Sequence, residues 1–134
     1  MSQVQVELFV YGSLMSGQSA AGLLGAHARR PATMRGHLWR LPAGYPLLVL
    51  DPNGPAVRGE VVQLDDAAAL HLVDVYEGVG SGPYQRLRAP VGSARAGAPS
   101  VDVWVYAVTD PRSARRAGAV PLRTSDWRKV APRR

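Results

Sequence analysis

Hydrophobic and polar side chains alternate along several short stretches of the chain, as they do in strands with one buried face. In the first stretch, apolar residues at positions 4, 6, 8 and 10 lead to the segment Tyr11-Gly12-Ser13-Leu14, where glycine permits a sharp turn. Similar patterns predict strands at 33–41, 84–91 and 101–108, with the small, glycine-containing segment 92–100 as a loop.

Two further apolar segments, 47–50 and 57–64, are separated by Asp51-Pro52-Asn53-Gly54. Proline and an Asn-Gly pair between two apolar runs are typical of a β-hairpin, and Gly54 can adopt positive φ. We therefore expect these two segments to be the strands of a hairpin.

Two short helices are predicted between the strands. One occupies about 19–24 and ends at Gly25. The other occupies about 66–75, because Asp65 and Asp66 can cap a run rich in alanine, the best helix former. Pro111 is expected to end the regular part of the chain.

The predicted fold is an α+β domain built on a small mixed, mostly antiparallel β-barrel with short flanking helices. Consecutive strands with short connections favour antiparallel pairing, and the strands exceed what one flat sheet in so small a domain needs. The 134 residues are enough for one domain that buries a core without disulfides.

Composition limits the chemistry. The chain has no cysteine, which excludes disulfides, cysteine-based metal sites and a cysteine nucleophile. His27, His37 and His71 are too far apart for a local metal motif, so we expect no metal and no cofactor. No apolar run approaches the ~18 residues of a membrane span, and no leader is evident. We therefore expect a cytoplasmic protein without a membrane partner.

The net charge of +6 comes from the C-terminal end of the chain. Residues 1–110 hold eight arginines and nine acidic residues, whereas 111–134 hold seven arginines and one lysine against Asp126. We expect a domain at 1–110 and a basic extension at 111–134, either packed on the barrel through Val120, Leu122 and Trp127 or partly disordered. An alternative function is nucleic-acid binding through the basic residues, but a neutral body with a basic tail supports it only weakly. These basic residues are Arg112, Arg115, Arg116, Arg123, Arg128, Lys129, Arg133 and Arg134.

Two places could carry chemistry. The turn at 11–14 could direct consecutive backbone N–H groups at a carboxylate, although a simple turn has the same sequence. Glu77 falls at the predicted end of a helix, where the partly negative helix terminus disfavours an ionised carboxylate. A raised pKa would suit Glu77 to proton transfer near neutral pH. The alternative is a solvated glutamate before Gly78.

Several short motifs, taken in order, resemble the γ-glutamylcyclotransferase-like superfamily, which includes γ-glutamylamine cyclotransferases and plant AIG2-like proteins. The resemblance covers about residues 4–110. The motifs are Phe9-Val10-Tyr11-Gly12-Ser13-Leu14, Gly44-Tyr45-Pro46-Leu47-Leu48-Val49, Val57-Arg58-Gly59-Glu60-Val61, Leu72-Val73-Asp74-Val75-Tyr76-Glu77-Gly78, Tyr84-Gln85-Arg86 and the strand at 103–108.

This resemblance implies a barrel with a central cavity and an intramolecular reaction. In that reaction the substrate's α-amine attacks its own γ-carbonyl, 5-oxoproline forms, and an amine or amino acid leaves. By resemblance, residues 11–14 bind the substrate carboxylate, Glu77 is the catalytic acid and base, and Tyr84 lines the cavity. Met15-Ser16-Gly17 departs from the family pattern, so the leaving group stays open. The alternative on the same scaffold is a non-catalytic domain that binds a small acid.

Overall fold

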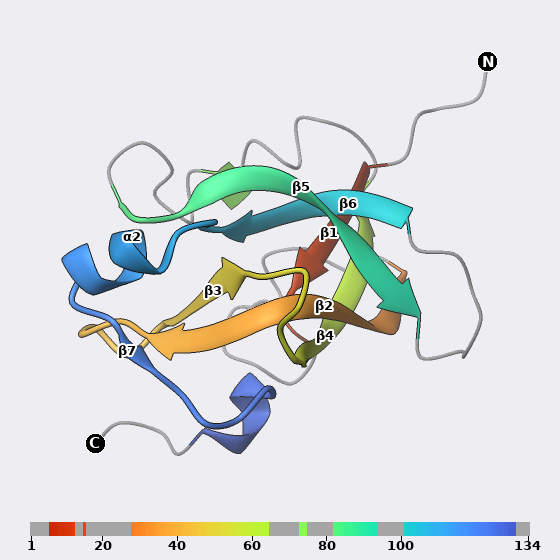
Figure 1. The fold of residues 1–134 in the computed structure, drawn as a ribbon. Helices are drawn as coiled ribbons and strands as arrows, with labels where there is room; N and C mark the ends of the chain where they lie inside the picture. Colours follow the sequence, from red (N-terminus) through yellow and green to blue (C-terminus); the bar gives the residue numbers. More distant parts are fainter. Residues whose placement is uncertain are drawn as a thin grey trace.

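A strongly curved sheet forms the body of the molecule (Figure 1). The computed structural model describes residues 6–12, 15, 28–64, 73–74, 82–93 and 101–130. Within them the elements, in chain order, are β1 (Val6–Val10), β2 (Arg29–Arg40), β3 (Pro46–Leu50), β4 (Ala56–Leu64), β5 (Gln85–Ser93), β6 (Val101–Ala107), α2 (Pro111–Arg116), β7 (Val120–Pro121) and the 3₁₀ helix η2 (Trp127–Lys129).

Five of the described strands close into a barrel. β2 pairs with β4, β4 with β1, β1 with β6 and β6 with β5. β5 then returns to β2 at Ala32 and Thr33. Among the strand pairs of the described residues, β1–β6 is the parallel one, and β3 and β7 pair with the far end of β2. The predicted mixed, mostly antiparallel barrel is confirmed.

The predicted strand positions agree with the structure, with small shifts at the ends. β2 begins at Arg29, four residues before the predicted start, and β5 runs on through Gly92 and Ser93, which we had placed in a loop. Val73 and Asp74 have helical backbone. The rest of the helix predicted at 66–75, the helix predicted at 19–24 and residues 94–100 lie outside the described residues.

The predicted hairpin is wrong. β3 and β4 do not pair with each other but both pair antiparallel with β2, β3 with residues 36–40 and β4 with residues 29–35. They therefore run in the same direction, and the segment between them loops out without reversing the chain. Asp51 shapes this loop, since its carboxylate accepts a hydrogen bond from the Asn53 amide at 2.9 Å. The described glycines with positive φ are Gly44 and Gly118, and Gly54 is not among them.

Pro111 starts a helix rather than ending the regular structure. It occupies the first turn of α2, where its missing N–H costs nothing, and Asp110 caps the helix by accepting from the Arg112 amide. The segment after Pro111 therefore continues with regular structure, and the prediction that it ends there is wrong.

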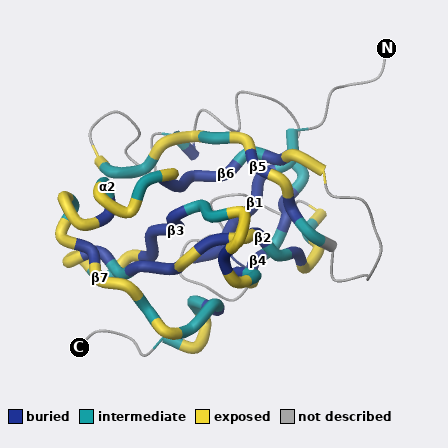
Figure 2. Tube along the Cα trace, viewed as in Figure 1, coloured by how far each residue is buried: buried dark blue, intermediate teal, exposed yellow. Residues whose placement is uncertain are grey.

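Figure 2 shows that buried residues are concentrated on the strands, and these residues form three clusters. The barrel core is formed by Phe9, Tyr11, Ala32, Met34, Leu38, Leu48, Val57, Val61, Ala89, Val91, Val103, Val105 and Ala107. A second cluster contains Leu8, Val10, Met15, Val62, Leu64, Val73 and Tyr106. A third, which we call the α2 cluster, contains Trp39, Leu41, Leu47, Val49, Val108, Ala114 and Ala119. Because residues on β1 and β6 alternate between the first two clusters, these strands are buried on both faces.

The C-terminal segment packs on the barrel. Leu122 and Trp127 lie against the barrel core, and Ala114 and Ala119 are part of the α2 cluster. Val120 does not pack as expected, because its side chain is 56% exposed while its backbone pairs with β2.

Candidate active site

The motif that resembles a substrate-binding loop begins where β1 ends. Tyr11 and Gly12 are both buried, and the Met15 amide donates a 3.0 Å hydrogen bond to the Gly12 carbonyl. Met15 is fully buried in the second cluster, so this bond ties Gly12 to that cluster. Ser13 and Leu14, the last two residues of the predicted turn at 11–14, lie outside the described residues.

Tyr11 ties this turn to two other strands. Its hydroxyl donates to the Tyr106 carbonyl at 2.6 Å and accepts from the Leu48 amide at 3.1 Å. The ring stacks near Phe9, with centroids 6.2 Å apart. Both hydrogen bonds are buried, where an unpaired polar group is costly, so the Tyr11 side chain fixes the end of β1 against β3 and β6.

Gly12 is packed against Pro46, the first residue of β3. A Cβ atom at Gly12 would lie 2.6 Å from Pro46 Cγ, which is too close for any side chain. The Tyr84 hydroxyl donates a hydrogen bond to the Pro46 carbonyl. Pro46 therefore joins the β1 turn to Tyr84, and two predicted site residues far apart in sequence meet around one proline.

Asp74 connects the same region to the segment that carries Glu77. The Tyr106 hydroxyl donates to Asp74 Oδ1 at 2.5 Å, and Arg86 Nη1 forms an ion pair with Asp74 Oδ2 at 2.9 Å. The Tyr106 carbonyl in turn accepts from Tyr11. A continuous series of contacts thus runs from Tyr11 through Tyr106 to Asp74.

Two arginines on β5 stack on Trp104 of β6 but differ in their polar contacts. The guanidinium carbons of Arg86 and Arg88 each lie 5.0 Å from the Trp104 ring centroid. Arg86 also reaches Asp74, whereas Arg88 donates to the Asp102 carbonyl at 3.0 Å. A comparison of the two arginines therefore distinguishes the effect of the Asp74 contact from the effect of the cation–π contact.

The structure therefore brings Gly12 and Tyr84 together around Pro46, while Tyr11 contacts Leu48 and Tyr106. Glu77 lies outside the described residues, as do Ser13 and Leu14. Our residue-by-residue interpretation gave no role to Pro46, Asp74, Arg86 and Tyr106, although each lies in one of the quoted motifs. The motifs themselves could have pointed to these residues, since Asp74, Arg86 and Tyr106 come from three different motifs and meet at the Asp74 carboxylate.

Two further properties concern the described residues alone. No three His, Asp or Glu side chains among them lie close enough together to hold a metal ion. None of their helices has the length and apolar character needed to cross a membrane.

Comparison with known proteins shows which family the chain belongs to. The model of the family described as "Gamma-glutamyl cyclotransferase, AIG2-like" matches residues 8–129. The chain belongs to this family, as the motifs suggested. The match continues past residue 110, where we had ended the resemblance. No curated protein matches the chain.

Solved structures share the fold. An AIG2-like protein from mouse is 24% identical, with a TM-score of 0.63, over 78% of this chain and 77% of the mouse chain. A protein from Arabidopsis thaliana is 28% identical, with a TM-score of 0.64, over 84% of this chain and 68% of that one. A structure described as a gamma-glutamyl cyclotransferase is 18% identical, with a TM-score of 0.65, over 97% and 90%.

Proposed function

We propose that the chain is a γ-glutamylcyclotransferase that converts the γ-glutamyl group of a γ-glutamyl amine or amino acid to 5-oxoproline and releases the amine. Family membership supports the general class. The observation that carries the proposal is the series of contacts from Tyr11 through Tyr106 to Asp74. Chain connectivity limits the distance between the Cα atoms of Asp74 and Glu77 to about 11 Å, since the two residues are three positions apart. The predicted carboxylate loop and the predicted acid can therefore serve one substrate.

The reaction needs the substrate to fold and protons to move. The backbone N–H groups of Gly12, Ser13 and Leu14 hold the substrate's α-carboxylate, which brings its α-amine next to its γ-carbonyl. The bond between amine nitrogen and γ-carbon forms, and the bond from that carbon to the departing nitrogen breaks. Glu77 accepts a proton from the attacking amine and delivers one to the departing nitrogen.

The two tyrosines of the predicted site have positioning roles in this scheme. The Tyr11 hydroxyl is bonded to two backbone groups, and the Tyr84 hydroxyl is bonded to the Pro46 carbonyl. Both hold the turn at Gly12 in place, and the ring of Tyr84 borders the site. Pre-organised loops of this kind lower the cost of fixing a substrate conformation.

Replacing Glu77 by Gln tests the assignment. The variant keeps the side-chain shape but cannot transfer protons, so we expect 5-oxoproline release to fall about 10²–10⁴-fold with an unchanged melting temperature. Glu7→Gln is the matched control, because Glu7 pairs with Arg30 on the barrel wall. The substrates are γ-glutamyl amino acids, γ-glutamyl-ε-lysine and γ-glutamyl alkylamides.

Two results would contradict the proposal in different ways. Wild-type turnover by Glu77→Gln would remove Glu77 from the mechanism. Binding of γ-glutamyl compounds to the wild-type protein without release of 5-oxoproline from any of them would favour the non-catalytic acid-binding domain.

A further inference from the structure

Arg40, the last residue of β2, carries a buried hydrogen-bond donor that has no acceptor within the described part of the chain. Its side-chain Nε is shielded from solvent and has no hydrogen-bond partner. None of the ion pairs among the described residues includes Arg40. A buried donor without an acceptor costs free energy, and the cost is larger for a charged group. Such a group in a native fold points to a functional partner.

The alternation of side chains along β2 sets the face on which Arg40 lies. Leu38 is part of the barrel core, and Trp39 is part of the α2 cluster. Because successive side chains of a strand point to opposite faces, Arg40 is on the same face as Leu38. Arg40 therefore continues the face of the barrel core to the end of β2.

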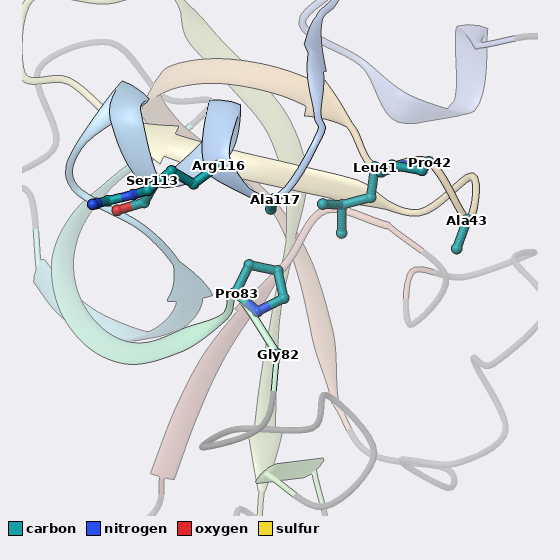
Figure 3. Close-up of a pocket in the computed structure, with 8 residues that line it drawn as sticks. All are labelled: Leu41, Pro42, Ala43, Gly82, Pro83, Ser113, Arg116 and Ala117. Atoms are coloured by element: carbon teal, nitrogen blue, oxygen red, sulfur yellow. The ribbon is translucent and has the colours of Figure 1, made fainter.

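The turn after Arg40 borders a surface pocket that Arg40 does not line. Figure 3 shows this pocket between residues 41–43 of the turn, residues 82–83 and helix α2. Leu41, which lines the pocket, belongs to the α2 cluster together with Trp39. Arg40 lies between these two residues in sequence, so its side chain is directed to the opposite face, away from the pocket.

Pro46 joins Arg40 to the candidate active site. Arg40 and Pro46 are directly opposite each other in the antiparallel β2–β3 pair. Such residues present their side chains on the same face, with Cβ atoms about 5 Å apart. The Pro46 ring packs on Gly12, where a Cβ atom would lie 2.6 Å from Pro46 Cγ, and the Pro46 carbonyl accepts from the Tyr84 hydroxyl. The Arg40 side chain thus lies at the end of the barrel that carries the turn at Gly12.

We propose that Arg40 binds the α-carboxylate of the γ-glutamyl group together with the backbone N–H groups of the turn at Gly12. This inference rests on the proposed cyclotransferase function, and it adds a charged side chain to a subsite otherwise formed by backbone groups. A guanidinium presents pairs of parallel N–H donors that match the two oxygens of a carboxylate. Nε is one donor of such a pair, so the substrate supplies the acceptor that Nε lacks within the chain.

Paired substrates isolate this contact. A γ-glutamyl compound with a free α-carboxylate is compared with its α-carboxamide, which can still cyclise because its α-amine and γ-carbonyl are unchanged. The wild type should prefer the carboxylate, and Arg40→Met should lower this preference in kcat/KM about 10- to 100-fold, since a charge-assisted pair of hydrogen bonds is lost. Arg40→Lys keeps the charge without the paired donors and should give an intermediate preference.

Arg35→Met is the matched control. Arg35 is on the same strand but exposed, and it donates to the Gly54 carbonyl at 3.1 Å. An odd number of positions separates it from Arg40, so it lies on the opposite face of β2. Its replacement should leave the preference for the carboxylate at the wild-type value.

Thermal unfolding separates substrate binding from a structural role. Arg40→Met should melt no lower than the wild type, because it removes an unsatisfied buried donor. Added 5-oxoproline should raise the melting temperature of the wild type more than its neutral carboxamide does, and Arg40→Met should lose this difference.

Three results would overturn the inference. They are an unchanged carboxylate preference in Arg40→Met, a lower melting temperature of that variant with equal losses for both substrates, and a stabilisation by 5-oxoproline that is absent from the wild type or retained in the variant. Failure of every substrate to cyclise would instead contradict the proposed function, and the 5-oxoproline measurement would still decide whether Arg40 binds the carboxylate.

Discussion

At the scale of single residues, two glycines in the motifs that resemble the family lie where a neighbouring strand comes too close for a side chain. A Cβ atom at Gly12 would meet Pro46, and one at Gly59 would lie 2.3 Å from the Val10 carbonyl oxygen and 2.6 Å from Phe9 Cζ. Gly59 on β4 thus lets the Phe9 ring fill the barrel core beside it. Both glycines shape the end of β1, one from within the turn and one from the neighbouring strand.

Asp126 is a single carboxylate that holds the C-terminal segment in shape. It is 8% exposed and caps η2 by accepting from the Arg128 amide at 3.1 Å. Burial acts to raise the pKa of Asp126, but hydrogen bonds from the Arg128 side chain and amide, with the charges of Arg128 and Lys129, outweigh it. The pKa of Asp126 therefore lies below its ordinary value.

This lowered pKa predicts acid-sensitive stability. A carboxyl group with a lower pKa in the folded state stabilises the fold above its unfolded pKa of about 4, and this contribution is lost as the pH falls through its folded pKa. We expect Asp126→Asn to reduce the free energy of unfolding by about 1 kcal/mol at pH 7, and this difference to shrink as the pH falls below about 4. Urea unfolding at several pH values measures the difference, with the exposed Asp102→Asn as the control. A constant difference across this range would contradict the role of the charge.

At the scale of elements, Asp74 links β5 and β6 to the segment that leads to Glu77. Its carboxylate is shared between Tyr106 of β6 and Arg86 of β5, with side chains of Asp74 and Arg86 that are 18% and 35% exposed. Charge-assisted contacts of this kind, partly shielded from water, restrict the position of the backbone that carries them. On the proposed function, Asp74 is a positioning residue for Glu77.

The positioning role predicts coupled variants. Asp74→Ala and Tyr106→Phe should each lower kcat with little change in KM, and the double variant should lose scarcely more than Asp74→Ala alone, because that variant already removes the contact with Tyr106. Arg86→Gln should also lower kcat, whereas Arg88→Gln should not, although both arginines stack on Trp104. Rates of 5-oxoproline formation and their pH profile are the readouts. Equal effects of the two arginine variants would mean that packing on Trp104, and not the Asp74 contact, matters.

At the scale of the whole molecule, the sequence predicted those features that depend on local pattern. Period-two alternation located the barrel strands, because successive side chains of a strand point to opposite faces of the sheet. The hairpin prediction was wrong because the segment Asp51-Pro52-Asn53-Gly54 predicts a turn but does not determine which strand the flanking strands pair with. Pairing of β3 and β4 with β2 is a property of register over many residues.

In the candidate site, too, local motifs predicted the residues but not their long-range contacts. Tyr11, Gly12 and Tyr84 were found through short motifs, and the structure brings Gly12 and Tyr84 to Pro46. The contact between Tyr106 and Asp74 spans 32 positions and depends on how β6 lies in the barrel. No local pattern encodes such a distance. The motifs therefore supplied the residues, and the closed sheet supplied their partners.

The boundary predicted at residue 110 can be tested on the whole chain. Helix α2 contributes Ala114 to the cluster that buries Trp39, Leu47 and Val49, and Trp127 packs against the barrel core. Removing residues 111–134 would expose these apolar side chains, a loss of several kcal/mol from a fold whose net stability is only about 5–15 kcal/mol. We expect a chain that ends at residue 110 to lose its cooperative thermal transition, whereas one that ends at residue 130 keeps it. Circular dichroism during heating makes the comparison. An unchanged melting temperature for the shorter chain would establish residues 1–110 as a domain that folds alone, with the basic segment as a true extension.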